Sequence, residues 1–308
     1  MTLVSIIITC FNSQNTIQRT IQSAISQDWP EKEIIIVDDH STDYSYELIT
    51  KIITKEKQIS LIRHRSNKGY PAALNSGIRK SKGEFIAIFD DDDDNSRDRI
   101  SLQVKKITEY EKDNKASIIL CYSNRDVFKP GSEKCDSKAL AIGRESPEPN
   151  GKEVADFILG FPSNPSKVWG MFGSCTLMVR KKIFEEVGLF DEAFRRTAEW
   201  DFAIRAAFKG AYFIAVNRSL IKMYKTSGSE KSGKIPLFYS IKLREKYKNY
   251  LKSNGFYNCS KLIAKSNFYL NKKKIFIGLF YRILALIISP KLMFHFLKTK
   301  IFNINKSS

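Results

Sequence analysis

The sequence has few cysteines, and they are not arranged as a cross-linked or zinc-binding set would require. It contains five cysteines in 308 residues, and no two form a Cys-X-X-Cys pair. Disulfide frameworks use an even set of cysteines, and structural zinc sites use such pairs. We therefore expect a protein of a reducing compartment. No leader-like segment precedes the first apolar run at Leu3, which favours a cytoplasmic location.

The signatures of two other enzyme classes are missing as well. No Gly-X-Gly-X-X-Gly sequence follows a predicted strand, which argues against a nicotinamide-dependent dehydrogenase. Residues 10–14, after the first predicted strand, lack the glycines and the basic residue that a sugar nucleotidyltransferase would place there. Internal repeats are not evident, so the length predicts one or two ordinary domains.

Acidic residues are almost absent from the last quarter of the chain. Residues 233–308 contain sixteen Lys or Arg and one acid, Glu245, which is a net charge of +15 out of +18 for the whole chain. The first 232 residues contain 35 bases and 32 acids, a net charge of only +3. A basic region of this kind first suggests nucleic acid.

Apolar runs within this basic region favour a membrane surface instead, and we expect no nucleic acid partner. The run at 275–288 is shorter than the ~20 residues of a spanning helix and contains Arg282. It suits a helix lying in the membrane plane, with Lys272, Lys273 and Lys274 facing anionic headgroups. The alternative is a buried helix that closes the preceding domain.

Strand-like and helix-like patterns alternate along the rest of the chain. This alternation predicts an α/β fold with a mainly parallel sheet flanked by helices, in which ligands bind beyond the carboxyl ends of the strands. The predicted strands are 4–9, 33–37, 59–63, 84–89, 117–122, 172–179 and 212–216. The predicted helices are 17–25, 46–55, 71–79, 98–113, 182–187 and 199–209, and 129–165 reads as a long loop region with a short helix at 154–159.

Five consecutive acids, Asp90 to Asp94, follow the strand predicted at 84–89. Adjacent carboxylates repel one another unless a cation lies among them, and their oxygens suit Mg²⁺ or Mn²⁺, which commonly hold nucleotide phosphates. The alternative is a solvated acidic turn before the next helix. A second polar cluster, residues 38–43, also ends a strand; an Asp there can accept hydrogen bonds from a base or ribose, while Ser41 or Asp43 caps the next helix.

Four motifs occur in order at these strand ends: Thr9-Cys-Phe-Asn12, Val37-Asp-Asp-His-Ser-Thr-Asp43, Asn67-Lys-Gly-Tyr-Pro-Ala-Ala-Leu-Asn75, and a Gly83 to Asp93 segment ending in the acidic run. Together they resemble glycosyltransferase family 2, with its Rossmann-like GT-A fold, over about residues 2–230. The resemblance implies an inverting transfer of a sugar from a nucleotide diphosphate, with UDP the expected nucleotide, to a hydroxyl. Residues 1–230 would form the GT-A domain and residues 231–308 a basic, amphipathic helical tail.

The resemblance also implies roles for individual residues on the donor side. Asp92 would be the direct ligand of Mn²⁺ or Mg²⁺, with the register open by one residue because Asp94 extends the run. The nucleotide-binding residues would be Thr9 and Phe11 in the base pocket with Asn12 beside them, Asp39 at the uracil or ribose, Asn67 and Gly69 beside the nucleotide, Asp90 nearer the ribose, and Asp91 in the middle of the Asp-X-Asp motif. The composition of the Gly/Ser loop that contains Lys225 suits a loop closing over the diphosphate, and the alternative is a solvated basic linker into the tail.

The family's base belongs to an acidic pair at a helix start, after a Gly-X-Phe-Asp turn. Gly188 to Asp191 supplies the turn, but Ala198 and Glu199 stand where Glu and Asp are usual. Glu199 is therefore the favoured base and Asp201 the alternative. Without the upstream motifs, the segment would read as a surface helix with Asp201 paired to Arg205.

On the acceptor side, residues 169–172 could offer an aromatic platform to a sugar ring. The Gln-X-X-Arg-Trp segment of processive synthases is missing, which favours one sugar, hexose or N-acetylhexosamine, per acceptor. We expect a saccharide or lipid-linked acceptor in cell-envelope polysaccharide synthesis, at the inner face of the cell membrane. The competing hypothesis is an inactive GT-A-like protein that binds membrane surfaces, as the missing acid at Ala198 would allow.

Overall fold

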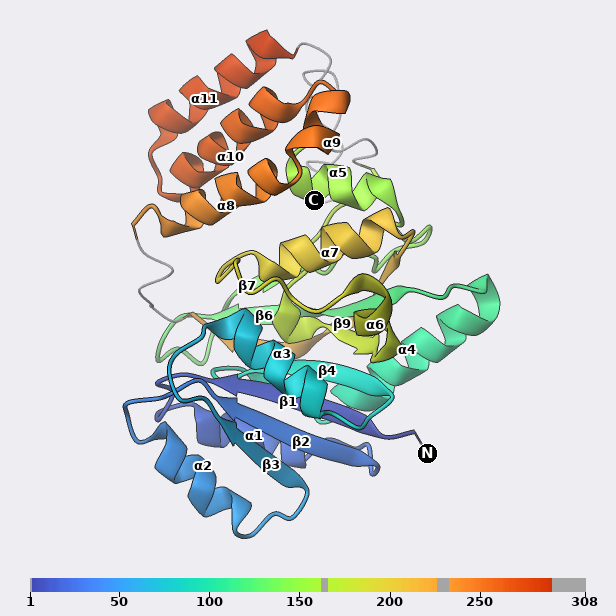
Figure 1. The fold of residues 1–308 in the computed structure, drawn as a ribbon, viewed down its shortest axis with the longest axis vertical. Coiled ribbons are helices and arrows are strands. Elements are labelled where there is room, and N and C mark those ends of the chain that lie inside the picture. Colours follow the sequence, from blue (N-terminus) through green and yellow to red (C-terminus); the bar gives the residue numbers. More distant parts are fainter. Residues whose placement is uncertain (1, 162–165, 226–232, 290–308) are drawn as a thin grey trace.

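The computed structural model describes residues 2–161, 166–225 and 233–289 as an α/β fold on one nine-stranded sheet (Figure 1). The strand order is β3-β2-β1-β4-β8-β6-β9-β5, and β7 pairs with β6. The predicted class, with flanking helices and a helical C-terminal extension, is confirmed.

The strands are β1 Val4–Cys10, β2 Lys32–Asp38, β3 Ile59–Arg63, β4 Phe85–Asp90, β5 Asp94–Asn95, β6 Ile119–Phe128, β7 Cys135–Ala139, β8 Met178–Arg180 and β9 Tyr212–Tyr224. The helices are α1 Ile17–Ile25, α2 Ser45–Ile53, α3 Tyr70–Lys80, α4 Arg99–Asn114, α5 Lys152–Leu159, α6 Lys182–Val187, α7 Ala198–Phe208, α8 Ile235–Lys246, α9 Lys248–Ser253, α10 Tyr257–Asn271 and α11 Ile275–Ile288, with a 3₁₀ turn η1 at Ser174–Thr176.

The central strands are covered on both faces, which explains their unbroken apolar sequences. Every residue of β1 is buried, and its neighbours β2 and β4 run parallel to it. Side chains of β1 pack with α3 on one face and with α1 and α4 on the other. The register places Thr9 beside Asp90 and Cys10 beside Asp38. The polar segments that follow these three strands therefore meet at one edge of the sheet.

The other half of the sheet is mixed. β8 runs antiparallel to β4 and β6, whereas β9 runs parallel to β6. A long excursion through β7 and α5 separates β6 from β8, so no single crossover helix fixes their relative direction. The strand predicted at 172–179 forms only in part, because Thr176 donates to the Gly173 carbonyl within η1. The strand predicted at 212–216 continues as β9 along the whole of β6.

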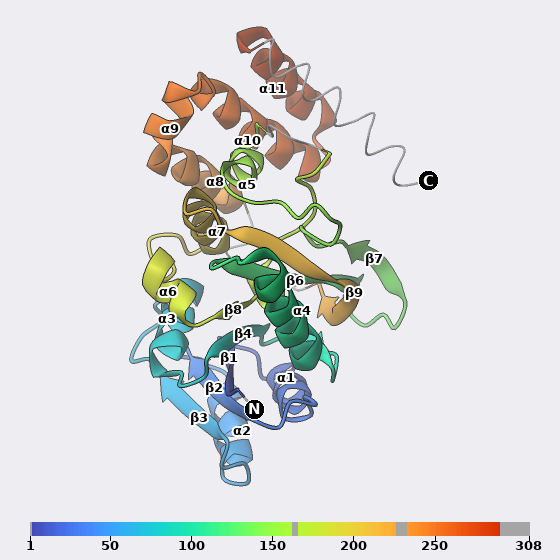
Figure 2. The same cartoon turned by 90° about the vertical axis from the view of Figure 1, so that its right-hand side faces the viewer.

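The C-terminal helices form a layer beyond α5 and α7, and Figure 2 shows this layer from the side. Leu243, Leu251 and Ile263 from this layer belong to the same apolar core as Phe202 of α7. The predicted domain boundary at residue 230 lies in 226–232, outside the described residues. Side chains of the C-terminal helices nevertheless pack into the same apolar core as those of the sheet domain.

Arg244 joins three helices of this region through one buried guanidinium. Its side chain is only 3% exposed. Its Nε donates to the Ser260 carbonyl at 2.9 Å, its Nη1 to the Ser240 carbonyl at 2.8 Å, and its Nη2 to the Leu159 carbonyl at 3.4 Å. Burial lowers the pKa of Arg244 to about 10, which still leaves it a cation at neutral pH. Leu159 ends α5, where the helix dipole favours a positive charge.

Replacement of this arginine should loosen the C-terminal layer. We expect Arg244→Met to lower the free energy of unfolding by about 3 kcal/mol, because buried carbonyls lose a charged donor. The exposed Lys252 of α9 provides the matched control, and Lys252→Met should change stability by less than ~0.5 kcal/mol. Urea unfolding followed by circular dichroism measures both. Equal stability of the two variants would contradict the role of Arg244.

Candidate active site

The loop after β1 is tied to the acidic run at the end of β4. The backbone N–H of Phe11 donates to Asp91 Oδ2 at 3.1 Å, and the Ser13 hydroxyl donates to the same oxygen. Burial raises the pKa of Asp91 to about 7, although the hydrogen bond from Ser13 lowers it. Asp91 therefore holds the loop, while the exposed ring of Phe11 is left for a ligand.

Asn12 connects this loop to the one after β2. It adopts a positive φ of 54°, which asparagine tolerates better than most residues. Its N–H donates to Ser41 Oγ at 3.0 Å, and its Oδ1 accepts from the N–H of Thr42 at 2.8 Å. Thr9, at the end of β1, is buried beside Asp90. Thr9 thus lies buried at the strand end, and Asn12 ties together the two loops that follow β1 and β2.

Asp39 organises the predicted nucleotide loop from within. Its Oδ1 lies 2.6 Å from His64 Nδ1 and accepts from the N–H of Lys68 at 2.9 Å, while its Oδ2 accepts from the N–H of Gly69 at 2.7 Å. The Asn67 amide donates to the Asp39 carbonyl at 3.3 Å. Gly69 has a φ of 91°, a conformation that favours glycine, immediately before α3. The structure thus brings Asp39, Asn67 and Gly69 into contact, while their role toward a nucleotide stays a prediction.

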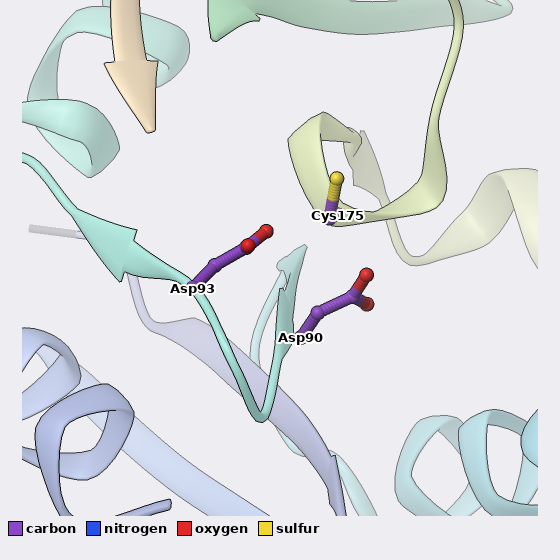
Figure 3. A group of neighbouring side chains, drawn as sticks. All are labelled: Asp90, Asp93 and Cys175. Carbon is purple, nitrogen blue, oxygen red and sulfur yellow. The ribbon is translucent and has the colours of Figure 1, made fainter. Parts of the chain in front are cut away.

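The acidic run gathers three ligand-type groups from distant segments. Carboxylate oxygens of Asp90 and Asp93 and the sulfur of Cys175 lie within 4.8 Å of one another, and Figure 3 shows the three side chains around one space. Tyr70 donates to Asp90 Oδ1 at 2.8 Å. Both carboxylate oxygens of Asp93 are buried and have no hydrogen-bond partner among the described residues. Such orphaned oxygens suit a bound cation.

The surroundings of Asp93 and Cys175 affect their pKa values and so the form in which each could meet a metal. Burial, together with the negative charges of Asp90 and Asp92, raises the pKa of Asp93, while Arg125 and Arg99 oppose the rise. Burial also raises the pKa of the Cys175 thiol. A neutral thiol is a poor ligand for Mg²⁺ or Mn²⁺. The two carboxylates therefore fit a hard cation and the sulfur does not.

Asp92, the predicted direct metal ligand, lies outside this three-residue group, and the carboxylate that joins Asp90 there is that of the next residue, Asp93, one position along the register left open by the motif. Its side chain is half-buried, and its backbone carbonyl accepts from Arg19 Nη2 at 2.6 Å. Asp94 belongs to β5 and pairs with Lys222 of β9. The extra acid is thus the start of a strand.

The two candidate bases on α7 have different surroundings. Asp201 is buried, pairs with Arg205 Nε at 2.8 Å as the i,i+4 spacing predicts, and accepts from Tyr247 and Lys246 at 2.7 and 2.6 Å. It therefore links α7 to the C-terminal helices. Both oxygens are occupied by these contacts, which leaves Glu199 as the better placed of the two.

Glu199 is half-buried in the first turn of α7. Burial raises its pKa, the negative charge of Asp90 raises it further, and Arg196 and Arg125 lower it. The negative charge of Asp90 thus acts on the candidate base, so the acidic cluster and Glu199 lie within electrostatic reach of each other.

A cavity of about 490 Å³ opens at Glu199, between α7 and the C-terminal helices. Its size lies in the range of small-molecule sites. Glu199 and Trp200 line it from α7, and the ring of Phe172 lies 5.8 Å from that of Trp200. Trp169 instead lies under the Arg144 guanidinium. The other residues that line the cavity are Phe157, Ile158, Gly160, Gly170, Met171, Arg196, Thr197, Pro236, Leu237, Ser240, Arg244, Ala264, Asn267, Phe268 and Asn271.

Lys225, predicted to contact the diphosphate, forms an ion pair with Asp136 of β7. Most of its Gly/Ser loop, residues 226–232, lies outside the described residues.

Three residues of this region were not predicted from the sequence: His64, Tyr70 and Cys175. Tyr70 lies inside a recognised motif and could have been singled out; His64 and Cys175 had no local signal.

Residues 5–188, more than half of the chain, match the family model described as glycosyl transferase family 2. The chain belongs to glycosyltransferase family 2. An uncharacterized glycosyltransferase of Rickettsia prowazekii is 32% identical over 200 residues, covering 65% of this chain and 57% of that protein. The Escherichia coli protein named UDP-Glc:alpha-D-GlcNAc-diphosphoundecaprenol beta-1,3-glucosyltransferase WfaP is 42% identical over 104 residues, covering 34% of this chain and 41% of its own. The match thus spans about half the length of these relatives.

The fold of this family 2 member is similar to that of S. aureus TarS 1-349. The crystal structure of that protein aligns with a TM-score of 0.58 at 15% identity, covering 87% of this chain and 72% of TarS. A second structure of it, in complex with UDP-GlcNAc, aligns with a TM-score of 0.55 at 16% identity, covering 87% and 80%. At this identity the likeness concerns the fold, and it confirms the predicted GT-A architecture.

Removal of the Asp39 carboxylate should destabilise the nucleotide loop. Two backbone N–H groups and a buried histidine would lose their acceptor, so we expect Asp39→Ala to cost about 3 kcal/mol of unfolding free energy. The exposed Glu186 of α6 provides a control, and Glu186→Ala should cost less than ~0.5 kcal/mol. Urea titration measures both changes. An Asp39→Ala protein as stable as the control would mean that the carboxylate does not support the loop.

Proposed function

We propose that this chain transfers a hexose or N-acetylhexosamine from a UDP-sugar to a hydroxyl of a saccharide or lipid-linked acceptor, with inversion at the anomeric carbon. The observation that carries the proposal is the position of Glu199 in the cavity beside the aromatic pair Trp200 and Phe172, with the charge of Asp90 near enough to raise the pKa of Glu199. A base for the acceptor then lines the cavity, and the carboxylate cluster that would face the donor diphosphate lies within electrostatic reach of that base. Transfer with inversion needs this arrangement, because the acceptor attacks opposite the departing diphosphate.

The names of similar proteins support the choice of donor and acceptor class. WfaP is named for a UDP-glucose donor and a diphosphoundecaprenol-linked acceptor, and TarS has been crystallised with UDP-GlcNAc. We extend the UDP donor to this chain, and we extend the lipid-linked acceptor with a role in cell-envelope polysaccharide synthesis. A position at the inner face of the cell membrane follows from these substrates and stays a prediction.

The residues that would hold Mn²⁺ or Mg²⁺ are Asp92, which the motif predicts, and the two converging carboxylates of Asp90 and Asp93. A bound divalent cation supplies charge stabilisation for the leaving diphosphate. Arg125 and Arg99 lie near enough to oppose the rise in the pKa of Asp93 and so favour its charged form, which is the form that a cation would bind.

Glu199 would accept the proton of the attacking hydroxyl. A carboxylate with a raised pKa holds a proton more firmly, which makes it a more effective base. Trp200 and Phe172 offer ring faces on which an acceptor sugar can stack. The exposed Phe11 ring at the opposite loop suits the uracil base.

The conservative substitution Glu199→Gln tests the proposed base. We expect kcat to fall at least ~10²-fold while UDP-sugar binding persists, because the amide cannot accept the proton. In the wild type, kcat/KM should decline as pH drops through the raised pKa of Glu199, above the usual value of 4.5. Glu186→Gln is the control and should leave both quantities unchanged. Full activity of Glu199→Gln would assign the proton to another group.

Three single substitutions test the metal register with Mn²⁺-dependent hydrolysis of UDP-sugars. We expect Asp92→Ala and Asp93→Asn each to lower the rate at least ~10²-fold, because the motif assigns the cation to Asp92 and the converging carboxylates include Asp93. Asp94→Ala should retain the rate to within about threefold, since the Asp94 contacts in β5 are made by its backbone. Titration with Mn²⁺ should show that Asp92→Ala and Asp93→Asn need more Mn²⁺ for half-maximal rate than the wild type, and that Asp94→Ala does not. An inactive Asp94→Ala with an active Asp92→Ala would shift the register.

A further inference from the structure

The last described helix, α11, turns its small and polar residues inward. Gly278 and Ala285 are its buried residues, and the Gly278 carbonyl accepts from Ser266 Oγ of α10 at 2.8 Å. A Cβ at Gly278 would lie 2.6 Å from Leu270 Cγ, so only glycine allows this close approach. Arg282 also points inward and donates to the Asn267 amide oxygen at 2.7 Å. The side of α11 that packs on α10 is therefore its least apolar side.

The outward side of α11 is almost entirely large and apolar. Phe276 is 90% exposed and Ile287 is 68% exposed. Surface helices of soluble domains normally turn such residues toward the core, and a contiguous apolar patch of this kind marks an interaction site. The exposed set consists of Ile275, Phe276, Ile277, Leu279, Phe280, Ile283, Ile287 and Ile288.

The length and the charge of this segment indicate what covers the apolar side. No helix within 2–161, 166–225 or 233–289 has both the length and the apolar character needed to cross a bilayer. At 14 residues, α11 is about 21 Å long, against a hydrocarbon core of about 30 Å. Three exposed lysines, Lys272, Lys273 and Lys274, precede it directly. A short apolar face beside clustered lysines fits the surface of an anionic bilayer.

Charge also argues against a second copy of this chain as the partner. Residues 233–289 carry twelve Lys or Arg and one acid, Glu245. Two such surfaces would bring like charges together, whereas an anionic lipid surface complements them.

We propose that α11 lies in the plane of an anionic bilayer surface, with its outward apolar side in the acyl boundary and Lys272–Lys274 among the headgroups. Asn267, the partner of Arg282, also lines the 490 Å³ cavity. Docking through α11 would therefore hold this cavity near the bilayer. That consequence rests on the proposed function, and it favours a lipid-linked acceptor over a soluble one.

Sedimentation of the full chain with vesicles tests the apolar side. We expect binding to phosphatidylcholine vesicles that contain phosphatidylglycerol, and at least ~10-fold weaker binding of the double variant Phe276→Ser, Phe280→Ser. Tyr44→Ser, an equally exposed aromatic site near α2 at the far end of the molecule, is the control and should bind as the wild type does. Circular dichroism checks that each variant keeps its helices.

A charge-matched pair of triple variants tests the lysines. Lys272→Gln, Lys273→Gln, Lys274→Gln should weaken binding to the anionic vesicles at least ~10-fold. Lys51→Gln, Lys55→Gln, Lys57→Gln removes the same net charge from exposed lysines at the far end of the molecule and should weaken it less than about twofold. If both variants lost the same amount of vesicle binding, the binding would depend only on the net charge of the protein, and the proposed orientation would be wrong.

Two further outcomes would overturn the proposal. One is the absence of vesicle binding by the wild type. The other is a dimer in analytical ultracentrifugation that becomes a monomer in the Phe276→Ser, Phe280→Ser variant, since a second copy would then cover α11. UDP-sugar hydrolysis without vesicles is measured in parallel, so that a failure of membrane binding is distinguished from a failure of the proposed transfer.

Discussion

The concentration of negative charge at the end of β4 is the constraint around which the site is built. Burial of neighbouring carboxylates is costly unless their charges are compensated. The protein meets this cost in two ways: the loop after β1 donates hydrogen bonds to Asp91, and Arg99 and Arg125 lie near Asp93. Neither arrangement satisfies the oxygens of Asp93. What is left is a preformed pair of converging carboxylates, Asp90 and Asp93, that a divalent cation would complete.

The same charge acts on the other side of the site. Asp90 contributes to the raised pKa of Glu199, so the character of the base depends on the state of the carboxylate cluster. A cation at the cluster would offset the charge of Asp90 and lower the proton affinity of Glu199. Arg196 and Arg125 already act in that direction. The two halves of the site are thus coupled through charge, and a change in one alters the other.

Much of the site could be predicted from sequence because it lies at strand ends. The motifs fixed the neighbourhood of Thr9, Asp39 and Asp90, since parallel strands bring their carboxyl ends together whatever the loops do. Contacts between distant segments could not be predicted. The burial of Asp93 depends on β5 pairing with β9, and Asp201 is bound by Tyr247 from the C-terminal layer.

The orientation of α11 is another feature that could not be predicted from the sequence. Its sequence predicted an apolar helix flanked by lysines, and a buried helix was the alternative. Hydropathy measures how apolar a helix is, but not which of its sides meets a neighbour. Packing on α10 requires close approach at Gly278 and hydrogen bonds from Arg282, and both select the less apolar side as the inner one. The exposed apolar side is therefore a consequence of how α10 and α11 fit, and it marks the surface through which this family 2 glycosyltransferase would meet a membrane.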